Sequence, residues 1–147
     1  MDKGLGVPFD CRLLIAGANG GAASWDIQYN NDGSIGFFRP YAGSPTSIYS
    51  SAGTIALNTW YHTAVVCNAG SARLYINGVL VAGPVTISLP TSAAQGLRIG
   101  YDDPGTVNFQ YNGYLSNVRI VKGVAVYTSA FTPSTTPLTA TQELIKN

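Results

Sequence analysis

The stretch LNTWYHTAVVCNAGSARLYINGVLVAG, Leu57–Gly83, decides the fold class. It contains strand-like apolar runs separated by two turn signals. Asn77-Gly78 lies between RLYI and VLVAG, and both central residues of a type I′ hairpin turn need positive φ, which Asn and Gly tolerate best. The CNAGSA run at 67–72 likewise joins WYHTAVV to RLYI. The stretch therefore predicts antiparallel strands connected by tight turns.

The rest of the chain repeats this pattern of short β-rich runs bounded by Gly, Pro, Asn, Asp and Ser. NNDGS at 30–34 gives a further turn, and no run shows apolar residues at helical spacing over three turns. Turn signals about every ten residues are typical of an antiparallel sandwich, so we expect an all-β fold. The runs are CRLLIA, WDIQY, SIGFFRPY, TSIYS, TIAL, WYHTAVVC, ARLYI, VLVAGPV, LRIGY and YLSNVRIV.

Two of these runs predict which strand faces are covered. Neither alternate face of WYHTAVVC carries a charge, so this strand is expected to be covered on both sides. In RLYI, Leu74 and Ile76 alternate with Arg73 and Tyr75, which predicts one solvent-facing side.

The chain has 147 residues, which fits one domain with a sizeable core. From residue 131 the sequence FTPSTTPLTATQELIKN is rich in Thr and Pro, and Pro133 and Pro137 favour extended backbone. We expect a β domain over residues 1–130 and an extended C-terminal arm over 131–147.

Charged residues make up 10% of the chain and the net charge is +1, whereas soluble domains usually contain about 25% charged residues. The eight Lys and Arg residues are scattered, so no surface for nucleic acid is indicated. No apolar run is long enough to cross a bilayer, and MDKGLGVPFD lacks the apolar core of a secretory signal. We therefore expect no nucleic-acid and no membrane partner.

Two cysteines, Cys11 and Cys67, are too few for a disulfide framework. One bridge between them and two inert buried thiols remain alternatives at this point.

Four motifs occur in order: LNTWYHTAVV, RLYINGVLVA, LRIGY and YNGYLSNVRIVKGVAVYTSAFTPST. Together they resemble the laminin-G/concanavalin-A-like lectin/glucanase jelly-roll domain, in the branch found in bacteriophage and bacterial surface structural proteins. The resemblance covers about residues 9 to 137 and implies an antiparallel two-sheet jelly-roll sandwich. Family members carry further strands upstream, so the resemblance implies either a minimal sandwich or an open sheet edge that another chain fills. Ser116 and Asn117 stand where the family often has acidic residues.

Glucanases of this fold need two carboxyl groups about 5–5.5 Å apart. The pattern Glu-x-Asp-x-x-Glu that places them is absent from the seven carboxylates of this chain: Asp2, Asp10, Asp26, Asp32, Asp102, Asp103 and Glu143. The resemblance implies a packing role for the lone histidine, His62. We expect no enzyme activity, no catalytic residue, no cofactor and no assigned metal.

Carbohydrate binding is the remaining candidate for small-molecule recognition, because tyrosine rings stack on sugars while Asp and Asn bond their hydroxyls. The candidate ligand-binding residues are Tyr101, Asp102, Asp103, Asn108 and Tyr111, to which Tyr41 and Tyr49 could add. Calcium at Asp102-Asp103 and a plain turn before proline both remain open as alternatives for this loop.

These observations favour a non-enzymatic structural or interaction module. The first expectation is a bacteriophage virion protein, a capsid decoration (cement) or tail component assembled in the host cytoplasm through contacts with capsid or tail proteins or with itself. The alternative is a lectin-like module that recognises cell-surface glycan outside the cell or at its surface.

Overall fold

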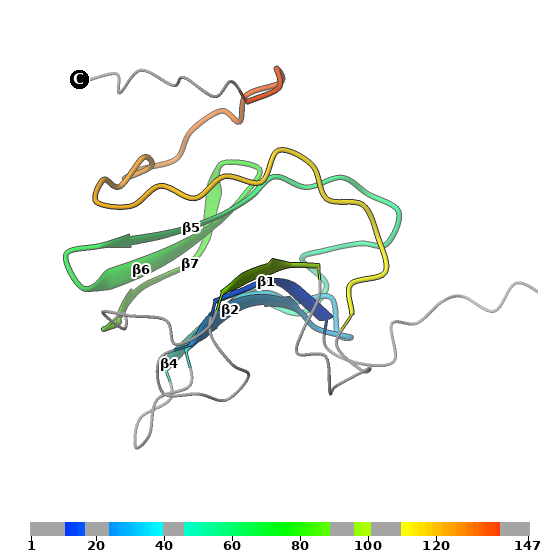
Figure 1. Ribbon diagram of the computed structural model, residues 1–147, viewed down its shortest axis with the longest axis horizontal. Coiled ribbons are helices and arrows are strands. Elements are labelled where there is room, and N and C mark those ends of the chain that lie inside the picture. Colours follow the sequence, from blue (N-terminus) through cyan, green and yellow to red (C-terminus); the bar gives the residue numbers. More distant parts are fainter. Residues whose placement is uncertain (1–10, 17–23, 40–45, 89–95, 101–109, 139–147) are drawn as a thin grey trace, which may run out of the picture.

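The computed structural model describes residues 11–16, 24–39, 46–88, 96–100 and 110–138. These residues form two antiparallel β-sheets stacked face to face, with no helix among them, as Figure 1 shows. The predicted all-β sandwich is confirmed. No helix in the described part is long and apolar enough to cross a membrane.

Among the described residues, one sheet has five strands and the other has three. The five-stranded sheet has the order β4-β3-β2-β1-β8, and the three-stranded sheet has the order β5-β6-β7. The strands are β1 (Cys11–Ala16), β2 (Trp25–Tyr29), β3 (Ile35–Arg39), β4 (Thr46–Tyr49), β5 (Thr63–Asn68), β6 (Ser71–Ile76), β7 (Val79–Thr86) and β8 (Leu97–Ile99).

The predicted turns form as their residues require. Asn77 and Gly78 have φ of 50° and 80°, the pair of positive values of a type I′ turn, between β6 and β7. Ala69 and Gly70 have φ of 47° and 74° between β5 and β6. In the β2–β3 turn, the Ser34 N–H donates to Asp32 Oδ1 over 2.8 Å. All three turns named in the sequence are confirmed.

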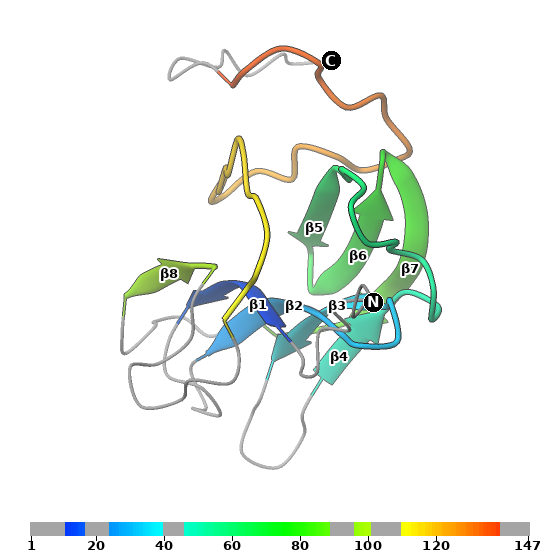
Figure 2. The same cartoon turned by 90° about the vertical axis from the view of Figure 1, so that its right-hand side faces the viewer.

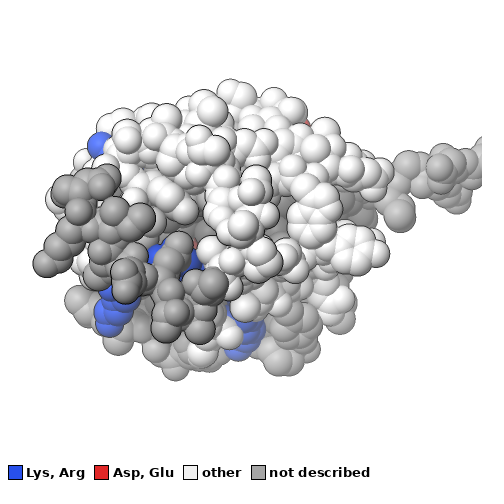
Figure 3. Space-filling view, turned by 90° about the horizontal axis from the view of Figure 1, so that it is seen from above, with Lys and Arg blue, Asp and Glu red and all other residues white. Residues whose placement is uncertain are grey.

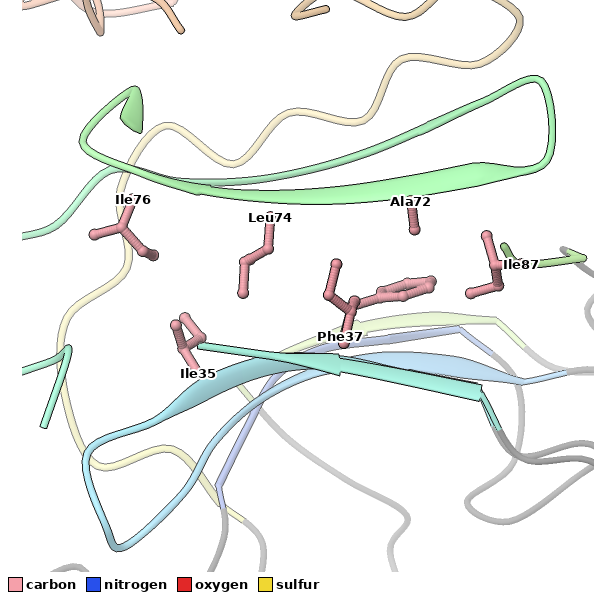
Figure 4. Close-up of a cluster of buried hydrophobic side chains, with 7 residues drawn as sticks. Ile35, Phe37, Ala72, Leu74, Ile76 and Ile87 are labelled. Atoms are coloured by element: carbon pink, nitrogen blue, oxygen red, sulfur yellow. The ribbon is translucent and has the colours of Figure 1, made fainter. Parts of the chain in front are cut away.

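The core lies between β3 and β4 of one sheet and the middle strand of the other, as Figure 4 shows. Burial of one such aliphatic or aromatic side chain stabilises a fold by roughly 1.5–3 kcal/mol. The buried side chains of this cluster are Ile35, Phe37, Ile48, Ala72, Leu74, Ile76 and Ile87.

The prediction that Tyr75 faces solvent is wrong. Leu74 and Ile76 do face the core, but Tyr75 on the opposite face is only 1% exposed. The Phe131 ring covers it, with ring centroids 5.6 Å apart. A residue far along the chain thus buries a face that alternation alone assigns to water.

Two predicted strands are absent from the described part of the chain. TIAL at 54–57 lies in turns, and YLSNVRIV at 114–121 forms no strand. A strand exists only with a hydrogen-bonded neighbour, and no described backbone group pairs with residues 114–121. The strand expected from WYHTAVVC begins at Thr63, because the His62 N–H bonds the Asn77 side chain (2.9 Å to Oδ1) rather than a ladder partner.

Candidate functional site

The proposed glycan loop falls mostly outside the described residues. The structure does not describe four of its five candidate residues, Tyr101, Asp102, Asp103 and Asn108, nor the additional tyrosine Tyr41. The glycan site therefore stays a prediction.

Two tyrosines of the candidate glycan site are described. The Tyr111 N–H donates to the Gly100 carbonyl over 3.1 Å, which holds Tyr111 beside the end of β8. The ring of Tyr49 lies over Gly36 on β3, and its hydroxyl accepts a bond from Gln28 Nε2. Tyr49 is therefore tied to the surface of its own sheet.

Four aromatic rings join the C-terminal segment to the three-stranded sheet. Tyr127 and Phe131 stack in parallel with centroids 3.6 Å apart. The ring of His62, just before β5, meets both edge to face, with centroids 6.2 Å from Tyr127 and 5.4 Å from Phe131. Together with the contact of Phe131 on Tyr75, these rings form an aromatic cluster that fixes residues 127–131 on the outside of this sheet.

The β6–β7 turn makes room for this cluster by carrying glycine. The Phe131 N–H donates to the Gly78 carbonyl over 3.0 Å. A Cβ at Gly78 would lie 1.7 Å from the Phe131 carbonyl oxygen, which no side chain tolerates. The turn glycine therefore serves both the positive φ and the close approach of the C-terminal segment.

His62 has the geometry of a packed histidine. Burial lowers the pKa of its imidazole, and a backbone hydrogen bond offsets only part of that effect. Its Nδ1 is buried and has no hydrogen-bond partner among the described residues. A general base needs an orienting acid on that nitrogen, and the aromatic rings that pack against His62 in the described part of the chain are those of Tyr127 and Phe131.

Cys67 carries a free thiol on β5. Burial raises its pKa, so the thiol stays protonated and weakly reactive at neutral pH. Among the described residues, no group of three or more His, Cys, Asp or Glu is arranged to hold a metal ion.

The most unusual surface is the apolar segment, residues 114–126. Seven of its large apolar side chains are between 37% and 83% exposed, with Tyr114 at the upper limit. Figures 1 and 2 show this segment rising from the five-stranded sheet and crossing above the three-stranded one. The seven residues are Tyr114, Leu115, Val118, Ile120, Val121, Val124 and Val126.

A second group of exposed apolar side chains lies on β8. Ile48, Phe37 and Ile27 lie in register on the inner face of the five-stranded sheet, which is turned toward the three-stranded sheet, and Ile99 on β8 continues this row. The row is buried at Phe37 and Ile48, yet Ile99 is 49% exposed, and Leu97 on the same face is 48% exposed.

The difference in width between the two sheets explains this exposure. Three strands cannot cover five, and the sheets meet where β4 faces β6 and β7. Figure 2 shows β8 at the far end of its sheet, beyond the edge strand β5. We refer to Leu97, Ile99 and the edge of β5 that pairs with no described strand as the open side of the sandwich.

Charge is sparse around these surfaces. Of the described carboxylates, Asp26 is 1% exposed and Asp32 lies in the β2–β3 turn. Arg119 and Lys122 are the cations of the apolar segment. Figure 3 views the molecule from the side of the C-terminal segment and shows a face of mainly uncharged atoms with a few basic side chains around it. An uncharged apolar face is the composition of a protein-docking surface.

Sequence reasoning missed the docking of Phe131 on Tyr75, which joins residues 56 positions apart. It also assigned residues 114–121 to the body of a sheet. The signal that favours a docking role was present in the low charge of the chain, but only the exposure of Leu97 and Ile99 shows where the sandwich is open.

Comparison with known proteins gives one family and one loose structural likeness. Residues 7–134 match the family model described as the Concanavalin A-like lectin/glucanases superfamily. No curated protein matches the chain. Among solved structures, the chain is similar to residues 221–444 of an S-layer domain-containing protein from Clostridium thermocellum, at 22% identity and a TM-score of 0.36. The match covers 84% of this chain and 59% of that one, and a likeness this distant says nothing about function.

Proposed function

The chain belongs to the concanavalin A-like lectin/glucanase superfamily, and we propose that it is a non-catalytic structural module. It assembles with protein partners, which include its own copies, through the apolar segment. The observation that supports this most is the exposure of seven large apolar side chains within residues 114–126. Monomeric proteins rarely leave a contiguous apolar patch of this kind open to water.

The low charge supports the same function. An apolar face with few cations has no charge pattern that selects an oppositely charged ligand. The free-energy cost of removing water from such a face on contact is small, because few charges lose their hydration. Association through such a face is driven by apolar burial, so it should withstand high salt, which screens exposed charges.

Light scattering on the purified chain over a range of concentrations tests this function. We expect concentration-dependent association that persists in 1 M salt, where the screening length is about 3 Å. The variant Val118→Ser/Ile120→Ser/Val124→Ser should remain monomeric. The matched control is Leu80→Ser, which removes an exposed apolar side chain from β7. A wild-type chain that stays monomeric throughout would contradict the proposal.

The finer assignment that we propose is a bacteriophage virion protein, a capsid decoration or tail component that is assembled in the host cytoplasm. It is supported by the family resemblance of the C-terminal motif and by an apolar segment suited to assembly. Purified phage particles probed with an antibody to the domain would test it. Labelling of the bacterial cell surface instead would favour an extracellular role.

A lectin-like role at the cell surface is the second candidate. Its support is the polar, aromatic composition of the loop after β8 and the position of Tyr111 beside Gly100. Binding on a glycan array that is lost in Tyr101→Ala, with folding intact, would favour it. Wild-type binding by that variant would place the glycan site elsewhere.

A further inference from the structure

We infer that Asn112-Gly113 is a site of spontaneous covalent modification, at which the Asn112 side chain loses its amide nitrogen as ammonia and becomes aspartate or isoaspartate. The fold leaves this pair exposed, whereas it protects the Asn-Gly pair of the β6–β7 turn, Asn77-Gly78. The reaction needs only water as a co-reactant, so it is independent of the proposed function.

The reaction is an attack by the main chain on its own side chain. The backbone nitrogen of the residue after asparagine bonds to Cγ, the bond from Cγ to the amide nitrogen breaks, and that nitrogen leaves as ammonia with the proton of the attacking N–H. Water then opens the succinimide ring at one of its two carbonyl groups. Opening at the side-chain carbonyl yields aspartate, opening at the main-chain carbonyl yields isoaspartate, and no step is an oxidation or a reduction.

The reaction depends on glycine and on a free asparagine side chain. Glycine has no side chain to shield its nitrogen, and it lets the backbone reach the conformation that the attack requires. The chain has three Asn-Gly pairs. Asn19-Gly20 lies outside the described residues, and the structure shows the surroundings of the other two.

Asn77-Gly78 is held in place on both sides of the bond that would react. The Asn77 Oδ1 accepts the His62 N–H over 2.9 Å, and the Asn77 N–H donates to the His62 carbonyl over 2.8 Å. Gly78 is buried, and its carbonyl accepts the Phe131 N–H over 3.0 Å. Ring closure here would have to break the bond to Oδ1 and move Gly78 away from the C-terminal segment.

Asn112-Gly113 has none of these restraints. Both residues are exposed and belong to no strand, and no described group forms a hydrogen bond with either of them. The chain is held just before the pair, where the Tyr111 N–H donates to the Gly100 carbonyl over 3.1 Å. The Asn112 side chain is therefore free to turn toward the nitrogen of Gly113.

Packing accounts for the glycine at position 113. A Cβ there would lie 2.7 Å from Cζ of Tyr111, so the tyrosine ring occupies the place that a side chain would take. The residue that makes the pair reactive is thus required by the position of its own neighbour.

The product changes the surface directly before the apolar segment. A neutral amide becomes a carboxylate that is ionised at neutral pH, which cancels the formal net charge of +1 of the whole chain. Isoaspartate also adds one carbon to the main chain, just before Tyr114, the most exposed apolar side chain of the segment at 83%. A modified chain therefore carries a new charge, and in the isoaspartate form a longer backbone, where the apolar segment begins.

Peptide mapping of the folded chain during storage tests the site. The purified protein is kept in mildly alkaline buffer, which favours loss of the proton from the attacking nitrogen, and is sampled over time. Trypsin cleaves after Arg73, Arg98 and Arg119, so Asn77 and Asn112 fall on different peptides. Mass spectrometry should show aspartate and isoaspartate at Asn112 while Asn77 stays intact. Conversion of Asn77 as fast as that of Asn112, or none at Asn112, would overturn the inference.

The unfolded chain is the matched control. In guanidinium chloride neither pair is held, so Asn77 and Asn112 should convert at similar rates. If Asn77 stays intact there as well, its protection comes from the local sequence and the inference fails.

A second control separates the site from the rest of the chain. Asn112→Gln keeps an amide but needs a larger ring for the same attack, so modification at this position should be lost. The melting temperature should be unchanged, because the Asn112 side chain is exposed and forms no hydrogen bond in the described part of the chain. An acidic form that accumulates in this variant as fast as in the wild type would place the reactive residue elsewhere.

Discussion

At the scale of single residues, two separate constraints require glycine at position 78: its positive φ and its close contact with the backbone of Phe131. Mutations can separate the two. Its φ of 80° disfavours any side chain, and a Cβ would also collide with the Phe131 carbonyl. Gly53 has a similar φ of 72° but nothing within 4 Å of its Cβ position. The two glycines therefore form a matched pair.

We predict that Gly53→Ala lowers the free energy of unfolding by about 1 kcal/mol, the cost of a left-handed alanine. Gly78→Ala should lose clearly more, because the backbone of Phe131 must also move. Denaturant unfolding of both variants measures the difference. Equal losses would show that the C-terminal segment does not rest on the turn.

His62 gives a prediction for acid stability. Burial lowers its pKa in the folded state below the ordinary 6.5. The folded state therefore disfavours the charged form: stability is fully present above pH 6.5 and is lost as the pH falls through the lowered folded value. Tyr127 and Phe131 face the ring, and neither carries a charge to compensate for the proton.

The melting temperature of the wild-type chain should therefore fall from pH 7 to pH 5, and that of His62→Gln should change less over this range. Asp32 affects stability in a different pH range. The hydrogen bond from Ser34 lowers its pKa below 3.8, so its effect appears only at more acidic pH. A wild-type curve that is flat between pH 7 and pH 5 would refute the role of His62.

At the scale of elements, the aromatic cluster decides whether residues 127–131 stay docked. Tyr75 is almost fully buried beneath Phe131, so the ring of Phe131 completes the outer face of β6. Val124 lies in the same stretch of chain but is half exposed.

Phe131→Ala should destabilise the fold by about 1–3 kcal/mol, less than the 3–5 kcal/mol of a fully buried Phe because Phe131 is only half-buried. Val124→Ala should have an effect within about 0.5 kcal/mol, as for other surface substitutions. Chemical unfolding followed by tyrosine fluorescence measures both. Similar values for the two variants would mean that the cluster adds no stability.

At the scale of the whole molecule, we predict that the protein has no glycosidase activity. Hydrolysis with retention needs paired carboxyl groups. Asp26 is buried within β2, and Asp32 lies in the turn that follows this strand, where Ser34 bonds it. Incubation with soluble β-glucans should release no reducing sugar. Release that is lost when a carboxylate is mutated would contradict this prediction.

The sequence alone determined the local features of the protein. Asn77-Gly78, Ala69-Gly70 and the NNDGS turn follow from residues that tolerate positive φ or cap their own backbone, and such preferences act within four residues. Alternation of apolar residues determined the inner faces, because a side-chain period of two needs only the strand itself. Turn spacing and alternation together were enough to predict two antiparallel sheets.

Only the tertiary structure decided which edges and faces are covered. The burial of Tyr75 depends on Phe131, and the exposure of Ile99 depends on a three-stranded sheet that is too narrow to reach it. Residues 114–121 have a strand-like sequence, but a strand also needs hydrogen bonds to a neighbouring strand, and no described backbone group pairs with this segment. These properties depend on contacts between distant parts of the chain, and a local sequence pattern does not show which distant segment packs against a given strand.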